Sequence, residues 1–314
     1  MCGIAGILYR NGSANGAPHA IGRDMTRMLQ SMKHRGPDST GYALYGPSQP
    51  GILIRYKLAD ANTPRDFDFD ERLERHQREV LARLDAAGAK VRDVKEETEY
   101  AYRATLEFDG DLKELADRVE SVTDAEVLSL GHSLEIVKDL GDAESVAEQY
   151  RLNDFKGTHA IGHVRMATES DVDISGAHPY WAYPFTDVAV VHNGQLTNYF
   201  QWRRRLERSG HRFQSECDSE IIAVYLAEKM AEGADLEAAM HESLEELDGV
   251  FTYIAVTGDS IGVAKDEMAA KPLVLYEADD MVALASEEIA IRAVIDEEID
   301  TYDPYEAEVM VWQR

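Results

Sequence analysis

The sequence predicts a layered α+β fold. Segments of strand length lie in neighbouring runs with helical segments grouped between them, which favours α+β layers over a parallel α/β sheet. Residues 3–9 form an apolar run with small residues at alternate positions, typical of a buried strand beside a close neighbour. The length of 314 residues suffices for one large domain or two moderate ones.

The remaining elements follow from periodicity and from turn residues. Residues 18–32 have helical spacing of apolar side chains, and Gly36-Pro37 ends that element. Residues 41–56 are predicted to form a hairpin that turns near 47–51. Further along, we predict strands at 158–168, 188–192, 250–257, 260–265, 272–277 and 281–285, helices at 197–209, 218–232 and 235–247, and a last helix followed by a strand that ends at Trp312.

The segment 59–152 differs in character from the rest of the chain. It is rich in charged residues and contains few of the residue types that chemistry needs. We interpret it as an inserted α+β subdomain within a single domain spanning 1–314. Its predicted elements are a charged helix at 70–87, a strand at 100–108, a helix at 111–120, a strand at 134–138 and a helix that ends near 150.

Composition excludes several classes of protein. The 59 acidic and 32 basic residues give a formal charge of −27, which repels nucleic acid and anionic membranes. This excess of acidic residues fits a protein that works in high salt, one that needs high solubility, or one that binds a basic partner. No run of 18 apolar residues and no secretory signal occurs, so we expect a cytoplasmic protein. Two cysteines form neither a disulfide framework nor a zinc motif, and we expect no metal.

Cys2 is the first candidate for chemistry. Methionine aminopeptidase should remove Met1, because the side chain that follows is small. The new N-terminal residue would then carry a thiol beside an α-amine with an ordinary pKa of about 7.7–8.0. A single residue would therefore supply both the nucleophile and its general base. The structural alternative is a buried cysteine that behaves as a small apolar residue.

Each of four further segments has both a structural and a functional interpretation. Residues 34–39 contain Gly-Pro and form at least a turn. Arg165 ends an apolar strand and is either a structural cation or a clamp for a carboxylate. Asn193 and Gly194 form either an ordinary turn or two donors of an oxyanion hole. Asp218 is either a helix N-cap or an acceptor for a substrate ammonium group. Together, in order, they describe an amide-hydrolysing site with α-amino acid recognition.

The ordered motifs resemble those of class II glutamine amidotransferases. The resemblance covers about 1–57 and 153–314 and implies the four-layer αββα fold of N-terminal-nucleophile hydrolases. Five motifs in order are far more specific than any single one. They are Met1-Cys2-Gly3-Ile4-Ala5-Gly6, His34-Arg35-Gly36-Pro37-Asp38, Arg165-Met166-Ala167-Thr168, His192-Asn193-Gly194 and Cys217-Asp218-Ser219-Glu220.

The resemblance implies a role for each matching residue. Cys2 would be the nucleophile, with Asn193 and the Gly194 N–H as the oxyanion hole. Arg165 would bind the α-carboxylate of glutamine, and Asp218 its α-amino group.

Other residues would support this site. Thr168 would line the pocket, and Arg35 and Gly36 would support the Cys2 end. The mechanism requires no histidine, so we predict structural roles for the three histidines in or beside these motifs, His163, His178 and His192.

Within the family, three segments are similar to the stand-alone amidotransferase subunits of archaeal-type glutamate synthase and of methylamine–glutamate N-methyltransferase: 165–170, 176–179 and 270–272. No P-loop, dinucleotide fingerprint or phosphoribosyl-binding run is present. We therefore expect a hetero-oligomer in which glutamine releases ammonia here and a separate synthase subunit accepts it. FMN and iron–sulfur are expected only on that partner.

Two alternatives remain open at this point. A stand-alone N-terminal-nucleophile amidase acting on another γ-glutamyl amide would use the same Arg165 and Asp218. A non-catalytic glutamine-sensing subunit, with 59–152 as its interaction surface, would not need the complete set of motifs.

Overall fold

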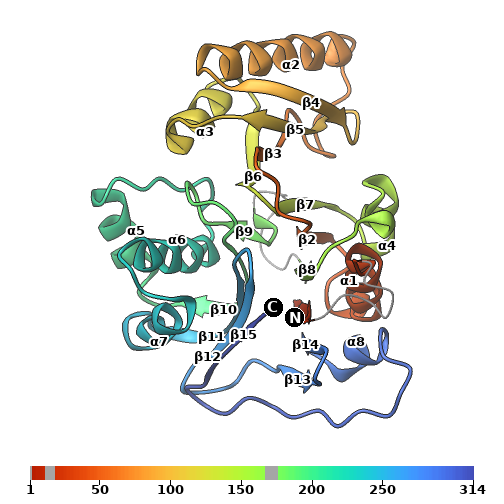
Figure 1. Cartoon of the computed structure of the whole chain (residues 1–314), viewed down its shortest axis with the longest axis vertical. Coiled ribbons are helices and arrows are strands. Elements are labelled where there is room, and N and C mark those ends of the chain that lie inside the picture. The colour runs from red at the N-terminus through yellow and green to blue at the C-terminus, as the bar shows by residue number, and fades with distance from the viewer. Residues whose placement is uncertain (1, 11–17, 167–175) are drawn as a thin grey trace.

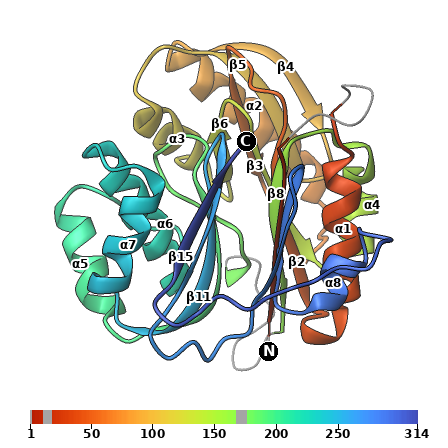
Figure 2. The same ribbon diagram turned by 60° about the horizontal axis from the view of Figure 1, so that its bottom comes forward.

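The computed structural model describes residues 2–10, 18–166 and 176–314 as a sandwich of two antiparallel sheets with helices outside each (Figures 1 and 2). The predicted four-layer αββα fold is therefore confirmed. The six-stranded sheet has the order β13-β14-β1-β8-β2-β7. Its strands are β1 (Gly3–Tyr9), β2 (Ser39–Tyr45), β7 (Leu134–Leu140), β8 (His159–Arg165), β13 (Val274–Glu277) and β14 (Met281–Ala285).

The second sheet has five strands in the order β15-β12-β11-β10-β9. They are β9 (Tyr180–Trp181), β10 (Ala189–Leu196), β11 (Gly249–Val256), β12 (Ser260–Lys265) and β15 (Val309–Gln313). The first sheet is covered by α1 (Ile21–Ser31), α4 (Ala143–Gln149) and α8 (Glu288–Arg292). The second is covered by α5 (Tyr199–Arg208), α6 (Asp218–Ala231) and α7 (Leu236–Glu246).

The strand β1 brings the two sheets together, as its apolar run predicts. Six of its seven residues are buried. A Cβ atom at Gly6 would lie 2.9 Å from Ile261 Cδ1 of the opposite sheet, so the missing side chain permits the close approach. On the other face of the sheet, α1 buries Met25, Met28 and Leu29. Cys2 therefore directly precedes a buried strand in the interior of the sheet.

The predicted hairpin at 41–56 is wrong. The strand β2 lies between β8 and β7, so both of its edges are occupied. The next strand, β3 (Ile52–Lys57), crosses instead into a third sheet and pairs there with β5 and β6. A turn between two apolar runs is a local signal, whereas the pairing of β2 is decided by strands that come much later in the chain.

The third sheet forms a subdomain at the top of Figure 1. Its order is β4-β5-β3-β6, with β4 (Lys90–Glu96), β5 (Ala101–Glu107) and β6 (Glu126–Gly131), and it packs against α2 (Phe69–Ala86) and α3 (Leu112–Glu120). We call residues 52–131 the insert from here on. This range starts before the segment 59–152 that composition indicated, and β7 and α4 belong to the sandwich.

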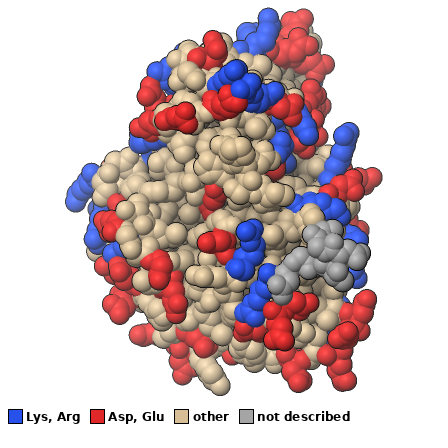
Figure 3. Space-filling view, in the orientation of Figure 1, with Lys and Arg blue, Asp and Glu red and all other residues tan. Residues whose placement is uncertain are grey.

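Charge is unevenly spread over the face seen in Figure 3. The lower half of that view bears mainly Asp and Glu, whereas Lys and Arg alternate with acidic residues on the insert. Among the described residues, no helix combines the length and the apolar character that a membrane span requires.

The carboxylate of Asp187 ties the end of the insert to the second sheet. It accepts hydrogen bonds from the backbone N–H groups of His132, Ser133 and Leu134, at 2.9, 2.9 and 2.8 Å, where the chain passes from β6 to β7. Asp187 has a φ of 57°, which Asn tolerates as readily as Asp.

We therefore predict that Asp187→Asn destabilises the fold without straining the backbone. The variant loses the charge and one acceptor oxygen, so its free energy of unfolding should fall by about 1–3 kcal/mol in urea titrations. The exposed Asp279→Asn should change it by less than about 0.5 kcal/mol. Equal stability of both variants and the wild type would contradict this role for Asp187.

Candidate functional site

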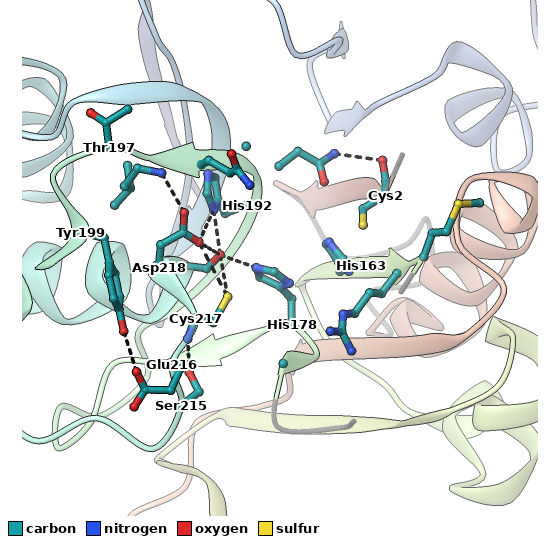
Figure 4. Close-up of a pocket in the computed structure, with 18 of the residues that line it drawn as sticks. Cys2, His163, His178, His192, Thr197, Tyr199, Ser215, Glu216, Cys217 and Asp218 are labelled. Carbon is teal, nitrogen blue, oxygen red and sulfur yellow. Dashed lines mark hydrogen bonds and ion pairs between the residues drawn. The ribbon is translucent and has the colours of Figure 1, made fainter. Parts of the chain in front are cut away.

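A cavity of about 830 Å³ lies between the two sheets at the end where β1 begins (Figure 4). Figure 4 shows Cys2 on one side of it and Cys217 and Asp218 on the other, with His163 and His178 between them. Its walls come from the first sheet, from β10 and from the segment before α6, and include Cys2, His163, Arg165, Gly176, His178, His192, Asn193, Gly194, Tyr199, Ser215, Cys217 and Asp218.

Cys2 is held by its backbone carbonyl. This oxygen accepts hydrogen bonds from Arg35 Nε at 3.1 Å and from Asn193 Nδ2 at 3.2 Å. Arg35 is fixed in turn by an ion pair with Glu287, at 2.6 Å. A Cβ atom at Gly36 would lie 2.5 Å from the carbonyl carbon of Arg165, so only glycine allows this turn to pass so close to β8. Arg35 and Gly36 therefore lie behind Cys2, at the end of the site where they were expected.

Asn193 and Gly194 lie on β10 and line the cavity together with Cys2. The Asn193 amide also donates to Ser286 Oγ at 3.3 Å, and the Ile4 N–H donates to the same oxygen at 3.0 Å. Gly194 has a φ of +146°, and a Cβ atom there would lie 2.2 Å from the Val250 carbonyl oxygen. Such a backbone requires glycine.

Ser286 is a residue that the sequence analysis missed. It follows β14 directly and its hydroxyl joins Asn193 to the start of β1. Ser286 is followed by two glutamates, so the local sequence indicates only the start of a helix.

Arg165 and Asp218 approach the cavity from a strand of the first sheet and from the start of a helix that covers the second sheet. Arg165 ends β8, and a Cβ atom at Gly176 would lie 2.9 Å from its guanidinium, so this arginine packs directly on the backbone. Asp218 is the first residue of α6, and its side chain does not cap that helix. One of its oxygens accepts the Leu196 N–H at 2.8 Å, and the side chain is 20% exposed. Thr168 lies outside the described residues.

Three buried histidines form part of the cavity wall. His178 Nε2 and His192 Nδ1 lie 2.6 and 2.7 Å from Ser219 Oγ. The rings of His163 and His178 stack with centroids 4.2 Å apart. One nitrogen on each ring, His163 Nε2, His178 Nδ1 and His192 Nε2, has no hydrogen-bond partner among the described residues.

Burial keeps these three rings neutral. It lowers the pKa of His163 to about 3 and that of His178 well below its usual range. Burial also lowers the pKa of His192, although the Asp218 carboxylate, 3.8 Å away, acts in the opposite direction. The wall beside Asp218 therefore carries no positive charge from histidine near neutral pH.

Cys217 is a second thiol in the cavity that the sequence analysis did not place there. Its sulfur lies 3.4 Å from Ser219 Oγ and 3.8 Å from an Asp218 oxygen. Burial raises the pKa of the Cys217 thiol, and the Asp218 carboxylate raises it further. This thiol is therefore kept in the protonated, weakly nucleophilic form.

The structure thus brings Cys2, Arg165, Asn193, Gly194 and Asp218 to one cavity, with Arg35 and Gly36 directly behind Cys2. Among the described residues, no group of three or more His, Cys, Asp or Glu side chains is arranged to hold a metal ion. The arrangement provides a thiol, side-chain and backbone donors, a cation and a carboxylate, which together suit an amide of an α-amino acid.

Comparisons with known proteins agree with this geometry. A family described as a glutamine amidotransferase domain matches residues 163–293. A Methanothermobacter thermautotrophicus protein named "putative glutamine amidotransferase" is 40% identical, and the match covers 98% of this chain and 99% of that protein. A Rhizobium meliloti protein named glutamine amidotransferase-like protein GlxB is 34% identical, with 100% and 99% covered.

A solved structure with the same fold is glutamine phosphoribosylpyrophosphate amidotransferase of B. subtilis. Its TM-score is 0.61 at 18% identity, and the match covers 99% of this chain but 47% of that one. The chain thus spans about half the length of that enzyme. At this identity the likeness shows the fold alone.

Because the buried histidines stay neutral in the folded protein, its free energy of unfolding should decrease at acidic pH. His163 binds a proton in the unfolded chain below about pH 6.5, but in the folded protein only near pH 3. Its contribution to stability is therefore complete above pH 6.5 and is lost as the pH falls towards 3. His163→Phe keeps an aromatic ring and removes this proton uptake, so the slope of unfolding free energy between about pH 6 and 4 should decrease by up to about 1.4 kcal/mol per pH unit.

Urea titrations at several pH values measure this slope. The matched control is His241→Phe, which changes an exposed histidine on α7 and should leave the slope as in the wild type. An unchanged slope in His163→Phe would show that His163 is not buried in its neutral form.

Proposed function

The chain belongs to the class II glutamine amidotransferases, and we propose that it is a glutaminase subunit whose nucleophile is Cys2 after removal of Met1. The observation that carries the proposal is the contact of 3.2 Å between Asn193 Nδ2 and the Cys2 carbonyl oxygen. This contact places the Asn193 amide next to Cys2, and both residues line the same cavity. Nucleophile and oxyanion donor then need only small side-chain movements to act together.

The reaction begins when the α-amine of Cys2 takes the thiol proton, directly or through a water. The thiolate attacks the side-chain amide carbon of glutamine, and the electron pair of the C=O bond moves to oxygen. Asn193 Nδ2 and the Gly194 N–H stabilise this oxyanion, an effect worth about 3 kcal/mol per donor. The protonated amine then gives its proton to the leaving nitrogen, ammonia departs, and water hydrolyses the γ-glutamyl thioester to glutamate.

Recognition of free glutamine uses the two charges at the other end of the cavity. Arg165 binds the α-carboxylate and Asp218 the α-ammonium group, while Thr168 stays a predicted pocket residue. The neutral histidine wall supports this assignment, since a charged His192 would compete with the substrate ammonium for Asp218. Cys217 plays no part in the chemistry, because its thiol stays protonated.

Ammonia then passes to a separate, glutamate-synthase-like subunit that carries FMN and iron–sulfur groups. Two observations support this step. The printed sequence contains no phosphate-binding or dinucleotide-binding motif that would bind an ammonia acceptor. The described strands and the helices that cover them belong either to the sandwich or to the insert.

The nucleophile is tested by measuring ammonia release from glutamine. Cys2→Ala should lower kcat/KM by at least about 1,000-fold, because the covalent intermediate cannot form. A wild-type chain with a residue retained before Cys2 should be similarly inactive, because it lacks the α-amine. The matched control, Cys217→Ser, should retain hydrolysis. Wild-type rates in Cys2→Ala would exclude Cys2 as the nucleophile.

The partner is tested by purifying the tagged chain from its own cells. We expect a flavoprotein subunit to co-purify with both the wild type and Cys2→Ala. Glutamine should support product formation only in the wild-type complex, whereas an ammonium salt should support it in both. A monomeric chain with full glutaminase activity and no such subunit would contradict this step.

A further inference from the structure

The segment 211–217 connects the insert to the glutamine cavity. It joins α5 to α6, has no regular secondary structure, and contributes Ser215, Glu216 and Cys217 to the cavity wall. Asp218 follows it directly. The position of the Asp218 carboxylate therefore depends on what holds this segment.

One side of the segment is held by the insert, whose helix α3 lies above α5 and α6 in Figure 1. Glu120 on α3 accepts hydrogen bonds from Gln214 Nε2 and pairs with Arg212. Arg212 Nε also lies 2.7 Å from an oxygen of Asp117, one turn earlier on α3. Gln214 Nε2 donates further to the Val127 carbonyl of β6, at 3.1 Å.

Glu120 is fixed by the insert itself. Its side chain is 11% exposed, and one oxygen accepts the Val127 N–H at 2.9 Å. A carboxylate so little exposed needs its partners, because an unpaired buried charge is strongly unfavourable. The pairing with Arg212 and Gln214 is therefore a firm connection and differs from the exposed ion pairs elsewhere on α3.

The other side of the segment is held by α6. Glu220 accepts hydrogen bonds from Gln214 N and Ser215 N at 2.7 and 2.8 Å, and from Ser215 Oγ at 2.7 Å. The Cys217 N–H donates to Ser215 Oγ at 3.1 Å. Hydrogen bonds on the side chain and on the backbone of Gln214 thus link Glu120 on the insert, through Glu220 and Ser215, to the residue before Asp218.

We propose that the insert sets the affinity for glutamine, with Glu120 as a positioning residue that acts through Arg212 and Gln214 on Asp218. The inference rests on the proposed function, in which Asp218 binds the α-ammonium group. That contact exists equally in bound glutamine and in the transition state, so displacing Asp218 weakens binding and leaves the chemical step nearly unchanged. The insert, which contributes no residue to the cavity, thereby acquires a role in the reaction.

The test is the steady-state hydrolysis of glutamine by Glu120→Gln. This change keeps the shape of the side chain but removes the charge that Arg212 requires. KM should rise about tenfold while kcat stays within about threefold of the wild type. The matched control is Glu114→Gln on the same helix, which loses only an exposed pair with Arg118 and should keep the wild-type KM.

A second variant distinguishes the loss of this link from a general folding defect. Arg212 is 35% exposed, so Arg212→Gln breaks the same link from the segment side with less disturbance of the insert. If the two residues act through one another, the double variant should raise KM no more than either single one. Melting temperatures show whether each variant is folded.

Each outcome decides the inference. A KM that rises in Glu120→Gln and Arg212→Gln, non-additively and at constant kcat, supports it. A wild-type KM in both folded variants, or a fall in kcat alone, overturns it while the proposed function stands. A folded wild-type protein, free of Met1, that does not hydrolyse glutamine overturns both.

Discussion

The Asn193 side-chain amide is the polar contact on which the site depends, because it bridges the two sheets of the sandwich. It comes from the second sheet and donates to the Cys2 carbonyl and to Ser286 Oγ of the first. Each such bond contributes only about 1 kcal/mol, less than the 1.5–3 kcal/mol of one buried aliphatic side chain. The apolar sheet faces therefore hold the sandwich together, and the amide determines where Cys2 lies between them.

The second constraint is electrostatic. A cavity that binds both ends of an amino acid needs its cation and its carboxylate kept apart and free of competing charge. Three buried histidines line this cavity, yet burial keeps them uncharged. One nitrogen on each ring has no partner among the described residues, which is unfavourable for stability. The proposed function accounts for this arrangement, since neutral rings leave the Asp218 charge to the substrate.

Sequence reasoning predicted the αββα fold and brought Cys2, Arg165, Asn193, Gly194 and Asp218 to one site, because those residues lie in short motifs of recognisable order. It failed where position depends on distant parts of the chain. The chain bends near 47–51, but β2 is paired on both sides by β7 and β8, so no hairpin forms. Ser286 contacts Asn193 across 93 positions, and Glu120 contacts Gln214 across 94. The strand β4 was missed because its exposed, charged side chains are typical of a sheet edge.

The central claim is that Cys2, and not the neighbouring Cys217, is the thiol that attacks glutamine. The most direct measurement is to treat the protein with the glutamine-like electrophile diazo-oxo-norleucine, digest it, and locate the adduct by mass spectrometry. The proposed function predicts a single adduct on an N-terminal Cys2 from which Met1 has been removed, with Cys217 unmodified because burial and the Asp218 carboxylate raise the pKa of its thiol. An adduct on Cys217, or none on Cys2 in a protein that hydrolyses glutamine, would contradict the account.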